Sequence, residues 1–453
     1  MATTILETCR VPAPPGAAAN LSLPLTFFDI QWLHFHPIRH LLFYDYPCSK
    51  PYFLETVAPK LKESLSLTLR HYLPLAGNLI FPLNSEKKPE IQYVAGDSAV
   101  SLTIAESASD FDHLTGNHAR DADQFYEFVP EIDPVTDESE YQRVPVVALK
   151  VTLFTGRGIC VGFANLHCLG DASSVVGFIK AWASISKLGG DEEEFLTKHA
   201  ESLPILDRSV INDPLGIDTI FWKVIRDVPL KSSSFPLPTN RVRATYILRQ
   251  ADIEKLKDLV LAKKPGLLQV SSFVVTASYV WTCFVKSEEQ VDDDDVLQVF
   301  IFAADIRARI DPPVPASYFG NCLAYGLAKI EHKQLVGGEG FVIAAEAIAD
   351  QIKNRLNNKD QVLKGAENWL SETKEMTAIR AFGVSGSPKF DLCSADFGWG
   401  RARKLETVSI DGEKHSMSLC KSRDSEGGLE VGISLPKARM DAFAAIFEEG
   451  LRF

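Results

Sequence analysis

The stretch Asn165-Leu166-His167-Cys168-Leu169-Gly170-Asp171 lies between two segments with different patterns. Before it, residues 158–164 form an unbroken apolar run, which predicts a buried strand. After it, residues 172–188 carry a helical pattern that ends at Gly189-Gly190. The sequence therefore places His167 at a strand-to-helix junction, with the carboxylate of Asp171 four residues further on.

His167 is a candidate general base. Neutral imidazole, with an ordinary pKa of about 6.5, accepts protons near neutral pH from a bound hydroxyl or amine. From these residues alone, a histidine with satisfied hydrogen bonds in a turn is an equally good interpretation. Asp171 is open to three roles: a second catalytic group, the orienting member of a triad, or a structural anion. No GxSxG motif supports a serine triad, and Cys168 is more consistent with packing than with nucleophilic attack.

The bulk composition is that of a globular protein with two domains. At 453 residues the chain exceeds the size at which a single core usually stops growing. Its net charge of -12 disfavours non-specific nucleic-acid binding, which needs a cationic surface. The 8 cysteines form no CxxC pair and no metal-ligand cluster, so we expect reduced thiols and no metal site.

No segment predicts export or membrane insertion. Residues 1–13 lack the basic region and apolar core of a signal peptide, and no uninterrupted apolar stretch reaches about 18 residues. We therefore expect a cytoplasmic protein that does not interact with a membrane, and we expect it to be a monomer.

The chain divides into two halves around a proline-rich segment. Residues 202–240 lose periodicity and accumulate prolines. We interpret this segment as a crossover linker between an N-terminal domain, residues 1–201, and a C-terminal domain, residues 241–453. Strands and helices do not alternate regularly, and no GxGxxG or GxxxxGK[ST] motif is present, which disfavours a nucleotide-binding doubly wound fold.

Local patterns predict the main elements of each half. In the N-terminal half they indicate a helix over residues 58–72, a hairpin of residues 144–154 with 158–164, and a second pair of strands at 91–94 and 100–105. In the C-terminal half they indicate strands at 242–248, 297–304, 321–329, 407–410, 417–420 and 429–435, and helices at 251–262, 271–285, 340–356 and 437–449.

Three further motifs have a functional and a plain interpretation. Residues 396–400 (DFGWG) predict a sharp turn with an indole N–H available as a donor, or an ordinary turn at a strand edge. Arg307 and Arg309 follow a strand and could pair with a buried carboxylate such as Asp171, or be exposed. Lys263-Lys264 ends a helix and could meet phosphates, or be solvated.

Taken together, these motifs resemble those of the BAHD acyltransferases, which transfer acyl groups from coenzyme A thioesters to alcohols or amines. HxxxD at residues 167–171 and DFGWG at residues 396–400 carry the resemblance by their order and separation. Residues 318–322 (YFGNC) resemble a third motif of the clade that acylates anthocyanins and phenolic glucosides. The likeness extends to residues 23–29 with 32–33, 73–77, 203–204 and 207–209.

The resemblance implies an α/β fold of two chloramphenicol acetyltransferase-like domains with the active-site channel between them. His167 would lie in the channel and deprotonate the acceptor hydroxyl, which then attacks the thioester. Asp171 would be structural and pair with an arginine, either Arg307 or Arg309. Further implied roles are an acyl or acceptor pocket formed by Trp32, His34 and His36, coenzyme A phosphate contacts from Lys263 and Lys264, and support of the channel from a distance by Asp396, Gly398, Trp399 and Gly400.

Three departures from relatives bear on the donor. Leu166 stands where many members have a second histidine, so the chemistry does not need that position. Val175-Val176 stands where some malonyl-transferring relatives have an arginine, and a malonyl carboxylate would then need another cation. Residues 384–386 stand where some hydroxycinnamoyl-transferring relatives have a tryptophan, which weakens that rival donor too.

The resemblance predicts an acyl-CoA-dependent O-acyltransferase. We expect malonyl-CoA as the donor and a hydroxyl of a phenolic or flavonoid glucoside as the acceptor, with acyl-CoA as a co-substrate and no bound cofactor. A hydroxycinnamoyl-CoA donor is the alternative within this class. A non-catalytic binding protein of the same fold and a thioester hydrolase are alternatives outside it.

Overall fold

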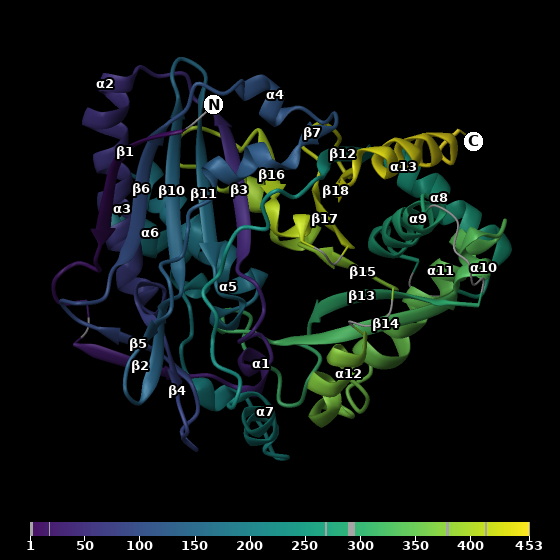
Figure 1. Ribbon diagram of the computed structural model, residues 1–453, viewed down its shortest axis with the longest axis horizontal. Coiled ribbons are helices and arrows are strands. Elements are labelled where there is room, and N and C mark those ends of the chain that lie inside the picture. The colour runs from purple at the N-terminus through teal and green to yellow at the C-terminus, as the bar shows by residue number, and fades with distance from the viewer. Residues whose placement is uncertain are drawn as a thin grey trace.

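The computed structural model describes residues 3–17, 19–267, 270–288, 295–376, 380–412 and 415–452. The first of its three sheets has six strands. Their order across the sheet is β1 (Thr4–Val11), β6 (Val100–Glu106), β10 (Val147–Phe154), β11 (Gly158–Asn165), β3 (Ile38–Asp45) and β16 (Lys404–Thr407). Figure 1 shows these strands side by side on the left of the view, with most of the C-terminal half on the right.

The second sheet contains most of the C-terminal strands. Its order is β14 (Leu323–Glu331), β13 (Leu297–Asp305), β15 (Arg380–Ser385), β17 (His415–Lys421), β18 (Leu429–Leu435), β12 (Val242–Leu248) and β7 (Arg120–Asp121). A third, smaller sheet runs β2 (Asn20–Pro24), β5 (Glu90–Val94), β4 (Asn78–Pro82), β9 (Tyr141–Pro145) and β8 (Thr136–Asp137).

The helices lie around these sheets (Figure 1). Those of the N-terminal half and the linker are α1 (Phe27–Ile30), α2 (Lys50–Tyr52), α3 (Ala58–His71), α4 (Phe111–Thr115), α5 (Ala172–Lys187), α6 (Glu192–His199) and α7 (Ile217–Ile225). Those of the C-terminal half are α8 (Gln250–Lys263), α9 (Ser272–Lys286), α10 (His332–Val336), α11 (Gly340–Asp350), α12 (Trp369–Met376) and α13 (Lys437–Glu449).

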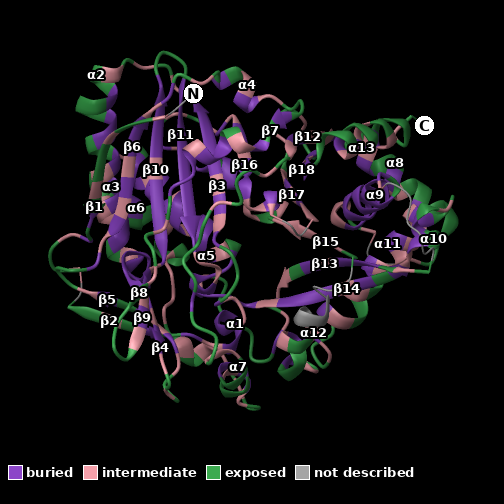
Figure 2. Cartoon of the chain, viewed as in Figure 1, coloured by how far each residue is buried: buried purple, intermediate pink, exposed green. Residues whose placement is uncertain are grey.

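The apolar run before His167 is the centre of the first sheet. All residues of β11 are buried, and β11 pairs antiparallel with β10 on one side and β3 on the other. Figure 2 shows the strands β10, β11 and β3 mostly in the colour of buried residues. A strand buried on both faces reads as a continuous apolar segment, which is why the sequence pattern identified it and its hairpin partner correctly.

Two predicted strands have a different arrangement. The pairing expected between residues 91–94 and 100–105 is wrong, because β5 pairs with β2 and β4 while β6 pairs with β1 and β10. The Ser98 hydroxyl accepts a hydrogen bond from the Val94 backbone N–H, in a turn that carries the chain from one sheet to the other. The strand expected at residues 407–410 is β16, which ends at Thr407 and is followed by a 3-10 helix (Val408–Asp411).

Each half contributes a strand to the sheet of the other half. β16 pairs with β3 of the N-terminal half, and β7 pairs with β12 of the C-terminal half. The proposed linker, residues 202–240, carries α7 and a 3-10 helix at Arg208–Val210. The domain boundaries at residues 201 and 241 stay a prediction. The short strands β16 and β7 each pair with a strand on the other side of these boundaries.

A buried ion-pair network joins the exchanged strands. Arg243 of β12 donates to Glu406 of β16 at 3.1 Å and to Asp411 at 2.7 Å. Arg120 of β7 donates to the other oxygen of Glu406 at 2.8 Å. Burial disfavours the ionised carboxylate of Glu406, but the charges of Arg120 and Arg243 more than offset it and lower its pKa to about 2. The network therefore holds both halves together through charges that water does not reach.

Replacing Arg243 with methionine should lower the free energy of unfolding by about 3 kcal/mol or more, because Glu406 and Asp411 lose a buried cation. Urea unfolding followed by tryptophan fluorescence measures the change. Arg157→Met is the control, since the ion pair of Arg157 with Asp112 is exposed and its loss should barely move the midpoint. An Arg243→Met protein as stable as the unsubstituted chain would contradict this assignment.

Candidate active site

The HxxxD segment occupies the junction between β11 and α5. β11 ends at Asn165, a 3-10 turn covers His167–Leu169, and α5 begins at Ala172. Asp171 is the N-cap of α5, where its Oδ1 accepts hydrogen bonds from the backbone N–H groups of Ser173 and Ser174. Aspartate is favoured at this position because it satisfies otherwise unpaired donors of the first helical turn. The strand-to-helix junction predicted from the sequence is confirmed.

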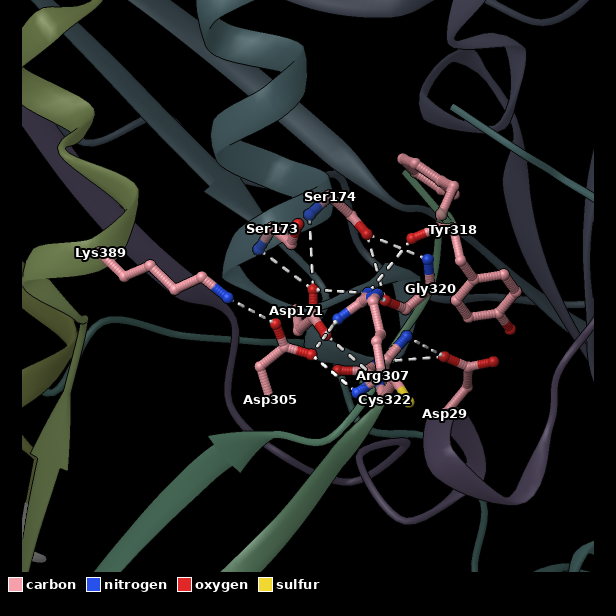
Figure 3. A network of polar contacts seen from close by, with 12 residues as sticks. Asp29, Asp171, Ser173, Ser174, Asp305, Arg307, Tyr318, Gly320, Cys322 and Lys389 are labelled. Atoms are coloured by element: carbon pink, nitrogen blue, oxygen red, sulfur yellow. Dashed lines mark hydrogen bonds and ion pairs between the residues drawn. The ribbon is translucent and has the colours of Figure 1, made fainter. Parts of the chain in front are cut away.

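Hydrogen bonds from Arg307, Cys322 and the first turn of α5 engage both oxygens of the Asp171 carboxylate (Figure 3). Arg307 donates to it through both terminal nitrogens, at 2.7 Å to Oδ2 and 3.1 Å to Oδ1. The backbone N–H of Cys322 adds a third contact, at 3.1 Å from Oδ2. With the two α5 donors, both oxygens are occupied, so Asp171 has no free acceptor for an imidazole N–H. This geometry fits a structural anion rather than a triad member.

Arg307, and not Arg309, is the partner of Asp171. The guanidinium of Arg307 is buried and also donates to the carbonyl oxygens of Tyr318 at 3.1 Å and Gly320 at 2.9 Å. Burial disfavours its charge, but the neighbouring Asp171 outweighs this and raises the pKa of Arg307. Arg309 is half-buried, and desolvation lowers its pKa. The alternative partner in the sequence-based hypothesis is therefore wrong, because the chain turns after Arg307 and carries Arg309 away.

The imidazole of His167 packs against two aromatic rings. Its plane lies 8° from that of Trp32, with the ring centroids 3.7 Å apart, and Phe35 meets it edge-on at 5.5 Å. Among the described residues its Nδ1 is buried without a geometrically sound hydrogen bond. Burial lowers the pKa of His167 to about 4, and hydrogen bonding to its own backbone and to Asn321 opposes this shift. The charge of His36 lowers the pKa further, so His167 is neutral at physiological pH.

Asn321 and Asp29 connect the two halves at this point. The side-chain Nδ2 of Asn321 donates to the backbone oxygen of His167 at 2.9 Å and to Oδ1 of Asp29 at 3.0 Å. Oδ2 of Asp29 accepts from the backbone N–H and hydroxyl of Thr26 at the start of α1. Asn321 lies in the motif at residues 318–322 and Asp29 in the motif at residues 23–29, but the sequence patterns alone assign neither residue a role. The one signal in the sequence is the presence of a polar side chain within each of these motifs.

Gly320 explains why YFGNC contains a glycine. Its φ is +143°, and a Cβ there would lie 2.2 Å from Nη1 of Arg208. That same nitrogen donates to the hydroxyl of Tyr318 at 2.6 Å. A larger residue would therefore displace the linker arginine that packs on this motif.

Of the three residues expected in the acyl or acceptor pocket, two lie at His167 and one does not. Trp32 and His36 lie at His167, with His36 stacked on Phe35 at 4.2 Å. His34 does not: its ring lies 6.2 Å from Phe81, and it is hydrogen-bonded to the backbone of Ile225 in α7. The reason is local: residues 31–35 form a turn with helix-like hydrogen bonds, so positions 32, 35 and 36 share one side and position 34 lies on another.

The lysine pair is not brought to His167. Lys263 forms an ion pair with Glu339 at 3.3 Å, and Lys264 forms one with Glu346 at 2.9 Å. Figure 1 shows α8 and α11 at the far right of the molecule, well separated from α1. Both ammonium groups already have exposed carboxylate partners, which is the solvated-helix-end interpretation of the sequence. The contact of these lysines with coenzyme A phosphates stays a prediction.

The DFGWG segment is a turn that anchors β16 to the first sheet. Oδ1 of Asp396 accepts from the backbone N–H groups of Gly398 at 2.8 Å and Gly400 at 2.7 Å, and both glycines have positive φ. Oδ2 of Asp396 pairs with Lys187 at the end of α5. The ring of Tyr44 in β3 packs edge-on against Trp399 at 5.3 Å. These contacts hold the turn against β3 and α5 and lead the chain directly into β16.

The described residues contain neither a membrane-spanning helix nor a cluster of metal ligands. No helix in this part of the chain is long and apolar enough to cross a membrane. No group of three or more histidine, cysteine, aspartate or glutamate side chains among these residues is arranged to hold a metal ion.

Comparisons with known proteins agree on one family. The Transferase family profile matches residues 1–450. The chain is 57% identical to malonyl-coenzyme:anthocyanin 5-O-glucoside-6'''-O-malonyltransferase of Salvia splendens, covering 99% of this chain and 96% of that protein. It is 47% identical to phenolic glucoside malonyltransferase 1 of Nicotiana tabacum, with 99% of each chain covered.

Solved structures share the fold at low sequence identity. Vinorine synthase matches with a TM-score of 0.70 and 18% identity, covering 97% of this chain and 96% of that chain. TRI101 of F. graminearum, complexed with ethyl coenzyme A, matches with a TM-score of 0.68 and 13% identity, covering 94% and 97%. The chain belongs to the Transferase family of BAHD acyltransferases, and the predicted α/β fold class is confirmed. It is an acyl-CoA-dependent acyltransferase.

Asp171→Asn should lower the free energy of unfolding by about 3 kcal/mol, because it leaves the buried charge of Arg307 without its main partner. Thermal unfolding measures the loss. Asp305→Asn is the matched control, since Asp305 contacts the same guanidinium at 3.1 Å but is 20% exposed, and should cost less. Unchanged stability with lost turnover in Asp171→Asn would instead assign Asp171 a direct part in catalysis.

Proposed function

We propose that this chain transfers a malonyl group from coenzyme A to a sugar hydroxyl of a phenolic or flavonoid glucoside, with His167 as the general base. Its relatives at 57% and 47% identity, aligned over nearly the whole chain, are named for this reaction. The observation that carries the role of His167 is geometric: both oxygens of Asp171 are engaged by other donors, so His167 has no carboxylate partner there. Burial also lowers the pKa of His167, which favours the neutral imidazole. A base that acts alone must be neutral before the substrate arrives.

The reaction balances with His167 as the only proton carrier. Because Nδ1 is buried, Nε2 takes the proton from the acceptor hydroxyl as its oxygen attacks the thioester carbonyl. The tetrahedral intermediate then expels the coenzyme A thiolate, and the imidazolium returns the proton to that sulfur. The products are the malonyl ester and free coenzyme A. Acyl-CoA is thus a co-substrate, and we further expect the enzyme to act as a cytoplasmic monomer.

A donor and acceptor assay tests this function. Purified protein with malonyl-CoA and a flavonoid glucoside should yield a malonylated product by mass spectrometry, and His167→Ala should reduce kcat by about 100-fold or more. Asn117→Ala is the control and should keep full turnover. The Asn117 side chain accepts a hydrogen bond from Lys404 and has no contact with His167. Turnover that survives in His167→Ala would contradict the assignment of the base.

The same assay separates the competing functions. One relative at 35% identity is named a coumaroyltransferase, so the assay offers p-coumaroyl-CoA and malonyl-CoA together as competing donors. Malonate released without acceptor would indicate a thioester hydrolase. A protein that binds the glucoside but transfers no malonyl, acetyl or hydroxycinnamoyl group would be a binding protein of the same fold.

The pH dependence of kcat/KM should be nearly flat between pH 7 and about pH 5. The pKa of His167 is lowered to about 4, so the neutral base is present above that pH and is lost only below it. A histidine with an ordinary pKa of about 6.5 would instead lose about tenfold or more of its activity over this range. Initial rates with a flavonol glucoside at constant ionic strength measure the profile, and a loss of that size would contradict the assigned environment.

A further inference from the structure

The face of the His167 ring is covered by a single side chain. The indole of Trp32 lies parallel to the imidazole within 8°, and their centroids are 3.7 Å apart, which is direct van der Waals contact across the whole ring. We propose that Trp32 is a positioning residue for the general base, holding the imidazole of His167 in one orientation and keeping water from its face. This proposal rests on the proposed role of His167 and goes beyond a wall of the substrate pocket.

Trp32 can hold His167 because Trp32 is itself held by both halves of the chain. On the N-terminal side, its backbone N–H donates to the carbonyl of Asp29 at 3.0 Å, which fixes the turn after α1. On the C-terminal side, the ring of Tyr325 in β14 lies 5.8 Å from the indole. The Tyr325 hydroxyl donates to the side chain of Gln31, next to Trp32, at 3.1 Å.

The surrounding rings leave the imidazole little freedom. Phe35 packs edge-on against both Trp32, at 5.1 Å, and His167, at 5.5 Å. Trp369 of α12 backs Tyr325 edge-on at 5.8 Å. Rotating the imidazole about its Cβ–Cγ bond would drive its edge into the indole, so Nε2 keeps one direction. A misplacement of about 1 Å at a catalytic group costs on the order of 100-fold in rate.

Stacking also affects the protonation of His167 in two opposing ways. Excluding water disfavours the imidazolium, whereas the electron-rich indole face stabilises it. The lowered pKa of His167 indicates that exclusion of water prevails. The other titratable groups at the ring are His36 beside Phe35, Asp29 beyond Asn321, and the hydrogen-bonded hydroxyl of Tyr325. The negative charge of Asp171 is paired with the positive charge of Arg307.

Trp32→Leu tests the proposal, because leucine removes the flat face and admits water. We expect kcat to fall by about tenfold or more at pH 7, and the acid limb of kcat/KM to move upward by about one pH unit or more, toward the ordinary histidine value. Trp32→Phe keeps an aromatic face and should retain most of kcat and an acid limb near that of the unsubstituted enzyme. Asn117→Ala, whose side chain accepts a hydrogen bond from Lys404 outside the site, is the control and should change neither kcat nor the acid limb.

The outcomes distinguish three roles. A higher KM for the glucoside in Trp32→Leu, with kcat and the acid limb unchanged, would overturn the proposal and leave Trp32 as a pocket wall. Trp32→Met refills the volume without a flat face and replaces the leucine variant if that one unfolds; unfolding of both would also overturn it in favour of a purely structural residue. Turnover that survives in His167→Ala would refute the proposed base itself, whatever Trp32 does.

Discussion

The buried ion pair between Asp171 and Arg307 is the constraint on which the site depends. Asp171 caps α5 in the N-terminal half, and Arg307 follows β13 in the C-terminal half, so this one contact ties the two halves together beside the base. Arg307 also binds the carbonyls of Tyr318 and Gly320, which places Asn321 against the backbone of His167. Desolvating two charges is expensive, and it is tolerated here because each charge has further hydrogen bonds.

The two ionisable groups of HxxxD are separated in function by their surroundings. Asp171 lies among five donors and serves as an anchor. His167, four residues earlier, lies among rings that cannot solvate a charge, and its pKa is lowered to about 4. Such a shift is worth about 3 kcal/mol against the imidazolium, which weakens the base but keeps it ready at any physiological pH. The imidazole of His167 is therefore available as a neutral base at physiological pH, although it is a weaker base than an ordinary histidine.

The exchanged strands explain why motifs so far apart in sequence act on one site. The DFGWG turn packs on β3 and α5 and directs β16 into the first sheet, where Glu406 meets Arg120 and Arg243. The second sheet in turn carries Asn321 and Tyr325 to the turn that follows α1. Contacts between segments hundreds of residues apart thus hold the two halves against each other.

The sequence by itself determined the elements whose pattern is local: the buried strand β11, the helix α5, and His167 between them. It also determined the family, because HxxxD, YFGNC and DFGWG occur together in order. Only the tertiary structure decided that Arg307 rather than Arg309 meets Asp171. It also decided that Trp32 and His36, but not His34, lie at His167. The ion pairs of Lys263 and Lys264 with glutamates of another segment were likewise visible only in the structure. Those outcomes depend on which segments meet across the fold, and long-range packing leaves no trace in the periodicity of a single chain.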